Sequence, residues 1–226
     1  MSGTEKILSP LGLFCYLPLM KIHLTLAAVL LVIGPLHAKK IPGKIVYRDK
    51  VVDVIFNIPF GILSFSPDYR KLQEGVTYYN AKGDREKIRA GLAREIIFTF
   101  KGKTIRMVSV NTPLDSRVFS SVRSKLFLKI EVDGALRLFT IYAVRHTAPT
   151  MNSAGGMSGG GSHTVEQYAL QRGNEDLVQP YWLKFRKEMV PYFQDCPELA
   201  DKIQKRELGF DDLTLIAAFY NSHCTE

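Results

Sequence analysis

The sequence has little cysteine and no set of metal-binding residues at a usable spacing. Only three of its 226 residues are cysteines. Cys196, Cys224 and His223 form an incomplete and badly spaced set, whereas a structural zinc site uses four ligands, most of them closely spaced in pairs. We therefore expect no metal site, and no motif in the sequence indicates a cofactor.

The sequence also lacks a long apolar run and a cluster of basic residues. The longest apolar run, Leu24–Gly34, is much shorter than the roughly 20 residues that cross a bilayer core. The formal net charge is +8, but lysines and arginines are interspersed with acidic residues rather than gathered in the stripe or arm that nucleic-acid binding needs. These two absences argue against a membrane span in the mature chain and against a nucleic-acid partner.

The segment 20–38 has the three parts of a cleavable signal peptide. Lys21 gives a basic start, Leu24–Gly34 is the apolar region, and Pro35 breaks the helix before the small residue Ala38. This order is typical of export signals. It predicts cleavage between Ala38 and Lys39 and a periplasmic or secreted protein.

Residues 1–19 do not fit in front of a complete export signal. They form a second, unpatterned apolar stretch. We interpret them as a mis-assigned start, with Met20 as the true initiator. The mature chain would then retain only Cys196 and Cys224.

Residues 39–180 have the pattern of a β-rich domain. Runs rich in β-branched and aromatic residues are separated by turn residues at regular intervals. Asp133-Gly134 separates two apolar runs and predicts a type I′ hairpin turn, and Lys101-Gly102 is placed in a similar way. The expected fold class is α+β, with an antiparallel β-sandwich or partly open barrel followed by a C-terminal helical segment with an αα-hairpin.

A glycine- and serine-rich stretch spans residues 153–162. Within it, the residues from Gly156 to Gly160 match the G-x-S-x-G pattern of hydrolases, with Ser158 as the nucleophile. That motif needs a strand before the serine and a helix after it, and neither flank is predicted to be helical. We interpret the stretch as a flexible loop without catalytic residues.

Residues 181–226 change to helical spacing and form the predicted C-terminal appendage. Trp182, Phe185, Met189 and Phe193 recur every three or four positions, which predicts a buried helix face. Pro197 favours the first position of a second helix with Cys196 as its N-cap. Asp211 is the expected cap of a third helix, whose predicted buried face includes Leu213, Ile216, Ala217 and Tyr220.

These helix boundaries bear on the two remaining cysteines. Cys196 begins one helix and Cys224 ends the next, so an antiparallel hairpin places both sulfurs at the same end. An exported protein leaves the reducing environment of the cytoplasm. We predict a Cys196–Cys224 disulfide, the alternative being two independent thiols.

Residues 185–221 resemble the carboxyl end of an uncharacterised group of exported proteins from Gram-negative bacteria. The mark of the group is Tyr-Phe-x-Asp-Cys-Pro-x-Leu, which begins at Tyr192 in this sequence. The preceding part is similar only in general pattern, from about Lys44. The resemblance implies export and a helical tail, and it brings no catalytic residue.

Two classes of function follow. The first is a non-enzymatic binding or envelope-associated module that recognises an unknown protein or envelope ligand through its loops. The second is a secreted or periplasmic hydrolase whose carboxylates converge only in the folded chain. The candidates for that role are Asp49, Asp53, Glu95, Glu131 and Glu166.

Overall fold

The computed structural model describes residues 38–61, 65–112, 125–151 and 157–224. The chain divides into two units, 1–37 and 38–226, and the description below concerns the second. The predicted mis-assigned start and all but the last residue of the predicted signal peptide lie outside the described residues. Ala38 is described, and Lys39 is the first residue of strand β1.

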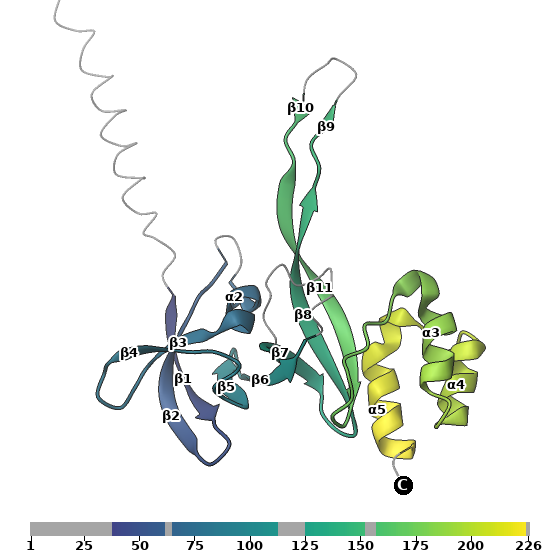
Figure 1. The fold of residues 1–226 in the computed structure, drawn as a ribbon, viewed down its shortest axis with the longest axis horizontal. Coiled ribbons are helices and arrows are strands. Elements are labelled where there is room, and N and C mark those ends of the chain that lie inside the picture. The colour runs from purple at the N-terminus through teal and green to yellow at the C-terminus, as the bar shows by residue number, and fades with distance from the viewer. Residues whose placement is uncertain (1–37, 62–64, 113–124, 152–156, 225–226) are drawn as a thin grey trace, which may run out of the picture. The chain divides into compact units, whose positions relative to one another are not determined.

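The core element is an open, nine-stranded antiparallel sheet (Figure 1) with the order β11-β8-β7-β6-β5-β1-β2-β3-β4. Its edge strands β11 and β4 do not pair with each other, so the sheet is not closed. The prediction of an α+β fold with an antiparallel, β-rich part and C-terminal helices is confirmed. The strands are β1 (Lys39–Val46), β2 (Val51–Ile58), β3 (Val76–Tyr79), β4 (Arg85–Ile88), β5 (Glu95–Phe100), β6 (Lys103–Asn111), β7 (Lys125–Val132), β8 (Leu136–Thr147) and β11 (Gly161–Arg172).

Strands β1 to β7 enclose an aromatic core. Phe56, Phe98 and Phe127 are fully or almost fully buried in it. The strands approach closely at Gly43, where a Cβ would lie 2.6 Å from the Phe56 ring. A glycine is therefore required for β1 to pack between β2 and β5.

The two predicted hairpins form, but with different turns. Lys101 and Gly102 have φ values of 49° and 74°, the paired positive values of a type I′ turn. At the other hairpin only Gly134 has a positive φ, of 155°, so the predicted type I′ turn is wrong. There the connection between β7 and β8 spans three residues, and Asp133 Oδ1 accepts a hydrogen bond of 3.1 Å from Gly134 N–H.

Strands β8 and β11 continue past the other strands to a short two-stranded ribbon (Figure 1), made of β9 (Thr150–Met151) and β10 (Met157–Ser158). Part of the predicted loop 153–162 is therefore strand. Ser158 lies in β10, and β11 follows Gly159-Gly160. The helix that a nucleophile elbow requires does not follow the serine in the described chain, while Gly156 and the Ser158 side chain lie outside the described residues.

The C-terminal helices α3 (Phe185–Tyr192), α4 (Pro197–Gln204) and α5 (Leu213–His223) share a second core with β8 and β11. Phe185, Met189 and Phe193 are buried there, as predicted, but Trp182 is 63% exposed. It lies in a 3₁₀ turn, Trp182–Lys184, before α3 begins. The apolar spacing that begins at Trp182 therefore placed the start of this helix about one turn too early.

The predicted starts of the later helices hold with one correction. Pro197 is in the first turn of α4, and Cys196 is its N-cap. For α5 the N-cap is Asp212 rather than Asp211, because a 3₁₀ turn, Phe210–Asp212, precedes the helix and takes up Asp211. Asp212 Oδ2 accepts a 2.8 Å hydrogen bond from Gly209 N–H at the start of that turn. The predicted buried face of α5, with Leu213, Ile216, Ala217 and Tyr220, is confirmed.

The predicted disulfide is confirmed. Cys196 and Cys224 are bonded, with their Cα atoms 5.5 Å apart. The bond joins the beginning of α4 to the end of α5. It fixes the helical hairpin against the second core, where Cys196 is buried.

Candidate functional site

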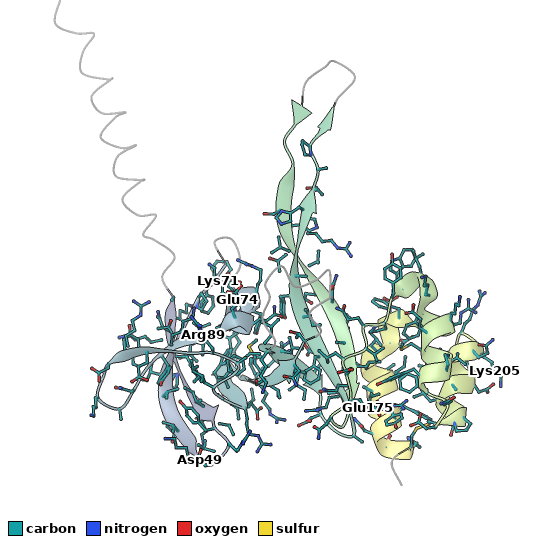
Figure 2. All side chains as sticks on the ribbon, in the orientation of Figure 1. Asp49, Lys71, Glu74, Arg89, Glu175 and Lys205 are labelled. Atoms are coloured by element: carbon teal, nitrogen blue, oxygen red, sulfur yellow. A yellow bond between two sulfur atoms is a disulfide. The ribbon has the colours of Figure 1, made fainter. Side chains whose placement is uncertain are left out.

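A polar cleft of about 700 Å³ opens on one side of the sheet. Its apolar floor comes from Val108, Val110 and Ile130 on β6 and β7. The turn before β5 and the turn after β11 contribute to its sides, and Figure 2 shows Glu175 in the second of these turns. The charged residues that line the cleft are Arg48, Arg94, Glu95, Arg106, Lys125, Asp133, Arg137, Glu175 and Asp176.

Arg106 joins two of the carboxylates in the cleft. Its Nε lies 2.5 Å from Glu95 Oε1, and its Nη1 lies 2.6 Å from Asp133 Oδ2. The hydrogen bonds to these two carboxylates raise the pKa of the guanidinium above its usual range. Strand register explains the first contact, because Glu95 and Arg106 are diagonal neighbours on β5 and β6. The second contact depends on the turn between β7 and β8.

Other charged groups in the cleft have no ion-pair partner among the described residues. These are Arg48, Arg94 and Lys125 on the basic side, and Glu175 and Asp176 on the acidic side. All five are exposed. Charges of both signs in an open cleft are therefore available to a ligand.

Side-chain bonds to the backbone hold the walls of the cleft in place. Ser109 Oγ donates to Ala90 O, and Arg137 Nη2 donates to Gly173 O. Gln171 is 8% exposed, and its Nε2 donates to Glu175 O at 2.7 Å. Its Oε1 has no hydrogen-bond partner in the described part of the chain. The described residues that line the cleft include no histidine and no cysteine.

The five carboxylates predicted as hydrolase candidates do not form one group. Only Glu95 lines the cleft. Asp53 is exposed, 3.9 Å from Lys44 Nζ, and Asp49 lies in the turn between β1 and β2 (Figure 2). The sequence analysis missed Arg106 and treated Asp133 only as a turn residue. A lone arginine among the apolar residues of β6 was the available signal.

Glu131 and Glu166 do share an environment, away from that cleft. The pKa of Tyr142 is raised above its usual range, mainly by burial, and the negative charges of Glu166 and Glu131 raise it further. Burial and the same two charges raise the pKa of Tyr69, whose ring stacks on Tyr142 at 5.1 Å.

Glu131 is already engaged by its neighbours in the folded chain. Its Oε1 lies 2.7 Å from Lys129 Nζ and accepts a 2.5 Å hydrogen bond from Thr140 Oγ1. The structure therefore places this carboxylate in a polar packing contact between β7 and β8.

The described residues offer neither a metal cluster nor a membrane-spanning helix. No group of three or more His, Cys, Asp or Glu side chains there is close enough to hold a metal ion. No helix in the described part of the chain is both long and apolar enough to span a membrane. Comparison with protein-family models, curated proteins and solved structures found no match.

Proposed function

We propose that this chain is an exported, non-enzymatic binding module whose cleft over β6 to β8 recognises a polar ligand with charges of both signs, such as a peptide. The observation that carries the proposal is the set of exposed charges in the cleft. Arg48, Arg94 and Lys125 offer cations, while Glu175 and Asp176 offer carboxylates, and all five lack an ion-pair partner in the described chain. The floor of valine and isoleucine suits aliphatic parts of the ligand.

The occupied carboxylates support binding over hydrolysis. Glu95 and Asp133 are both held by the guanidinium of Arg106. Hydrolysis by two carboxylates needs one as an acid and the other as a base or nucleophile. A pair that shares one arginine is poorly suited to those roles. The alternative, a secreted or periplasmic hydrolase, has its best support in the approach of Glu131 and Glu166 to Tyr142, but neither residue lines the cleft.

Export is supported by the disulfide together with the signal-peptide pattern. Disulfides form and persist in the periplasm or outside the cell and are rare in the cytoplasm. Cys196–Cys224 is such a bond. The apolar run before Ala38 supports the same compartment, as does the resemblance of the tail to exported proteins.

The test is an NMR titration of the purified protein with the tripeptides Lys-Ala-Glu, Lys-Ala-Lys and Glu-Ala-Glu. We expect Lys-Ala-Glu to bind best and to shift amide signals of β6, β7 and the turn after β11. Arg94→Gln should weaken its binding, whereas Arg70→Gln, on helix α2 (Tyr69–Glu74) and outside the cleft, should not. Shifts confined to other parts of the chain, or no binding by any tripeptide, would contradict the proposal.

A further inference from the structure

Three consecutive apolar side chains point to solvent just before α3. Tyr181, Trp182 and Leu183 are 47%, 63% and 61% exposed. A single exposed apolar side chain is ordinary, whereas a contiguous exposed apolar patch marks a protein- or membrane-interaction surface. Trp182 is also the only tryptophan of the chain.

A basic hollow lies beside these side chains. It has a volume of about 490 Å³ and is lined by Trp182 and Leu183 together with four cations, Lys184, Arg186, Lys187 and Arg206. None of the four cations forms an ion pair in the described chain, and no acidic residue lines the hollow.

Acidic residues that neighbour the lining residues along the chain do not themselves line the hollow. Glu188 follows Lys187 and is half-buried, and Glu207 follows Arg206 but lies 4.0 Å from Lys202 Nζ. Asp211 and Asp212 follow Phe210, and Asp212 Oδ2 accepts a hydrogen bond from Gly209 N–H. We call the seven residues Tyr181, Trp182, Leu183, Lys184, Arg186, Lys187 and Arg206 the Trp182 patch.

We propose that the Trp182 patch docks on the surface of an anionic phospholipid bilayer. Tryptophan and tyrosine favour the boundary between acyl chains and headgroups, because their rings are apolar at one end and polar at the other. Lysine and arginine next to them are attracted by anionic headgroups, each by about fivefold in the binding constant. The seven residues combine both requirements on one side of the helical segment.

The exposure of the apolar side chains favours a bilayer over an acidic peptide. Tyr181, Trp182 and Leu183 are exposed, and their transfer into an apolar phase is favourable. An acidic peptide would neutralise the hollow but offers no such phase. The inference depends on the proposed export in one respect, because the compartment decides which bilayer the protein meets. It does not depend on the proposed cleft, since the patch and the cleft share no lining residue.

The test measures Trp182 fluorescence of the full chain during titration with lipid vesicles. One set contains phosphatidylcholine alone, and the other contains equal parts of phosphatidylcholine and phosphatidylglycerol. Trp182 is the only tryptophan, so its emission reports contact at the patch. The apolar run Leu24–Gly34 contains no tryptophan, and its insertion into a vesicle would not produce this signal directly. We expect a blue shift with phosphatidylglycerol vesicles only, weakened by added salt.

Charge-reversal variants decide whether the patch is responsible. Arg186→Glu with Lys187→Glu should raise the lipid concentration at half-maximal shift by about 25-fold or more. The matched control, Lys82→Glu with Arg85→Glu, changes two exposed cations at the turn between β3 and β4 and should leave it unchanged.

Three outcomes would overturn the inference. They are no shift with either vesicle, the same loss in both double variants, and a shift with soluble polyglutamate but not with vesicles. The last result would assign the patch to an acidic peptide. Arg94→Gln should leave the vesicle response intact, so failure of the cleft proposal and failure of this inference are distinguishable.

Discussion

The side-chain amide of Gln73 hydrogen-bonds both backbone groups of Tyr142. Tyr142 N–H donates to Gln73 Oε1 at 2.6 Å, and Gln73 Nε2 donates to Tyr142 O at 2.9 Å. β7 pairs with β8 only as far as Thr140. Beyond that residue, this edge of β8 has no neighbouring strand. The amide takes the place of that strand, and Gln73 is only 4% exposed.

Removing the Gln73 amide should destabilise the chain because it leaves two buried backbone groups without partners. We expect Gln73→Met, which is similar in size, to lower the free energy of unfolding by about 2–4 kcal/mol. Urea denaturation followed by circular dichroism measures the change. Lys71→Met on the same helix is the control, since its ion pair with Asp68 at 3.2 Å is on the surface and contributes about 0–1 kcal/mol. Equal losses in the two variants would show that the amide has no special role.

The role of Gln73 also shows what the sequence could not predict. Strand periodicity, the positions of the two hairpins and the helix start at Pro197 depend on short-range patterns, and the sequence predicted them. The disulfide spans 28 positions and was predicted from the helix boundaries that bring Cys196 and Cys224 to the same end. Gln73 and Tyr142 are 69 residues apart, and no local pattern marks a polar side chain that replaces a strand.

The same limit applies to the cleft and to the Trp182 patch. Arg106 meets Asp133 at a separation of 27 residues, so this contact depends on the arrangement of three strands and a turn. Trp182 fits the helical spacing of Phe185 and Met189, yet it lies outside the helix. Spacing alone does not say where a helix begins.

The link between Arg106 and its two carboxylates predicts a destabilised variant. Arg106→Met should lower the free energy of unfolding by about 1–3 kcal/mol near pH 7, because it leaves Glu95, whose side chain is 13% exposed, without its cation. Urea denaturation at pH 7 measures the change.

Neutral replacements of the carboxylates provide the control for Arg106→Met. Adding Glu95→Gln and Asp133→Asn to that variant removes both uncompensated charges. This triple variant should recover much of the loss at pH 7. A triple variant as unstable as Arg106→Met would mean that packing of the arginine side chain, rather than its charge, carries the effect.

The Cys196–Cys224 disulfide should contribute measurably to stability. The bond closes a loop between residues 28 positions apart, and the chain-entropy model assigns such a loop about 3.6 kcal/mol. Cys196→Ser with Cys224→Ser should lower the free energy of unfolding by about that amount, measured by urea denaturation. Dithiothreitol should destabilise the original chain to a similar extent and leave the double variant unchanged. If dithiothreitol also destabilised the double variant, its effect on the original chain could not be assigned to this disulfide.

The hydroxyl of Tyr192 is buried and has no hydrogen-bond partner among the described residues, although the Arg172 guanidinium lies 4.2 Å from the centre of its ring. Tyr192→Phe keeps the ring and removes the unpaired hydroxyl. We therefore expect the free energy of unfolding at pH 7 to stay the same or to rise by up to about 1 kcal/mol. A clear loss of stability would mean that the hydroxyl has a partner in solution, such as a water molecule.

The same variant should change the response to alkali. Burial raises the pKa of Tyr192 to about 12 in the folded chain, against about 10 for an unfolded tyrosine. As pH rises, the unfolded chain loses this proton first, so the stabilising effect of Tyr192 is complete below about pH 10 and declines between about pH 10 and 12. Tyr192→Phe should lose less stability across that range than the original chain, whereas Tyr181→Phe, at a half-exposed position, should follow the original curve. Identical curves for all three proteins would place the alkaline loss at other tyrosines, of which Tyr78 and Tyr142 also have a raised pKa.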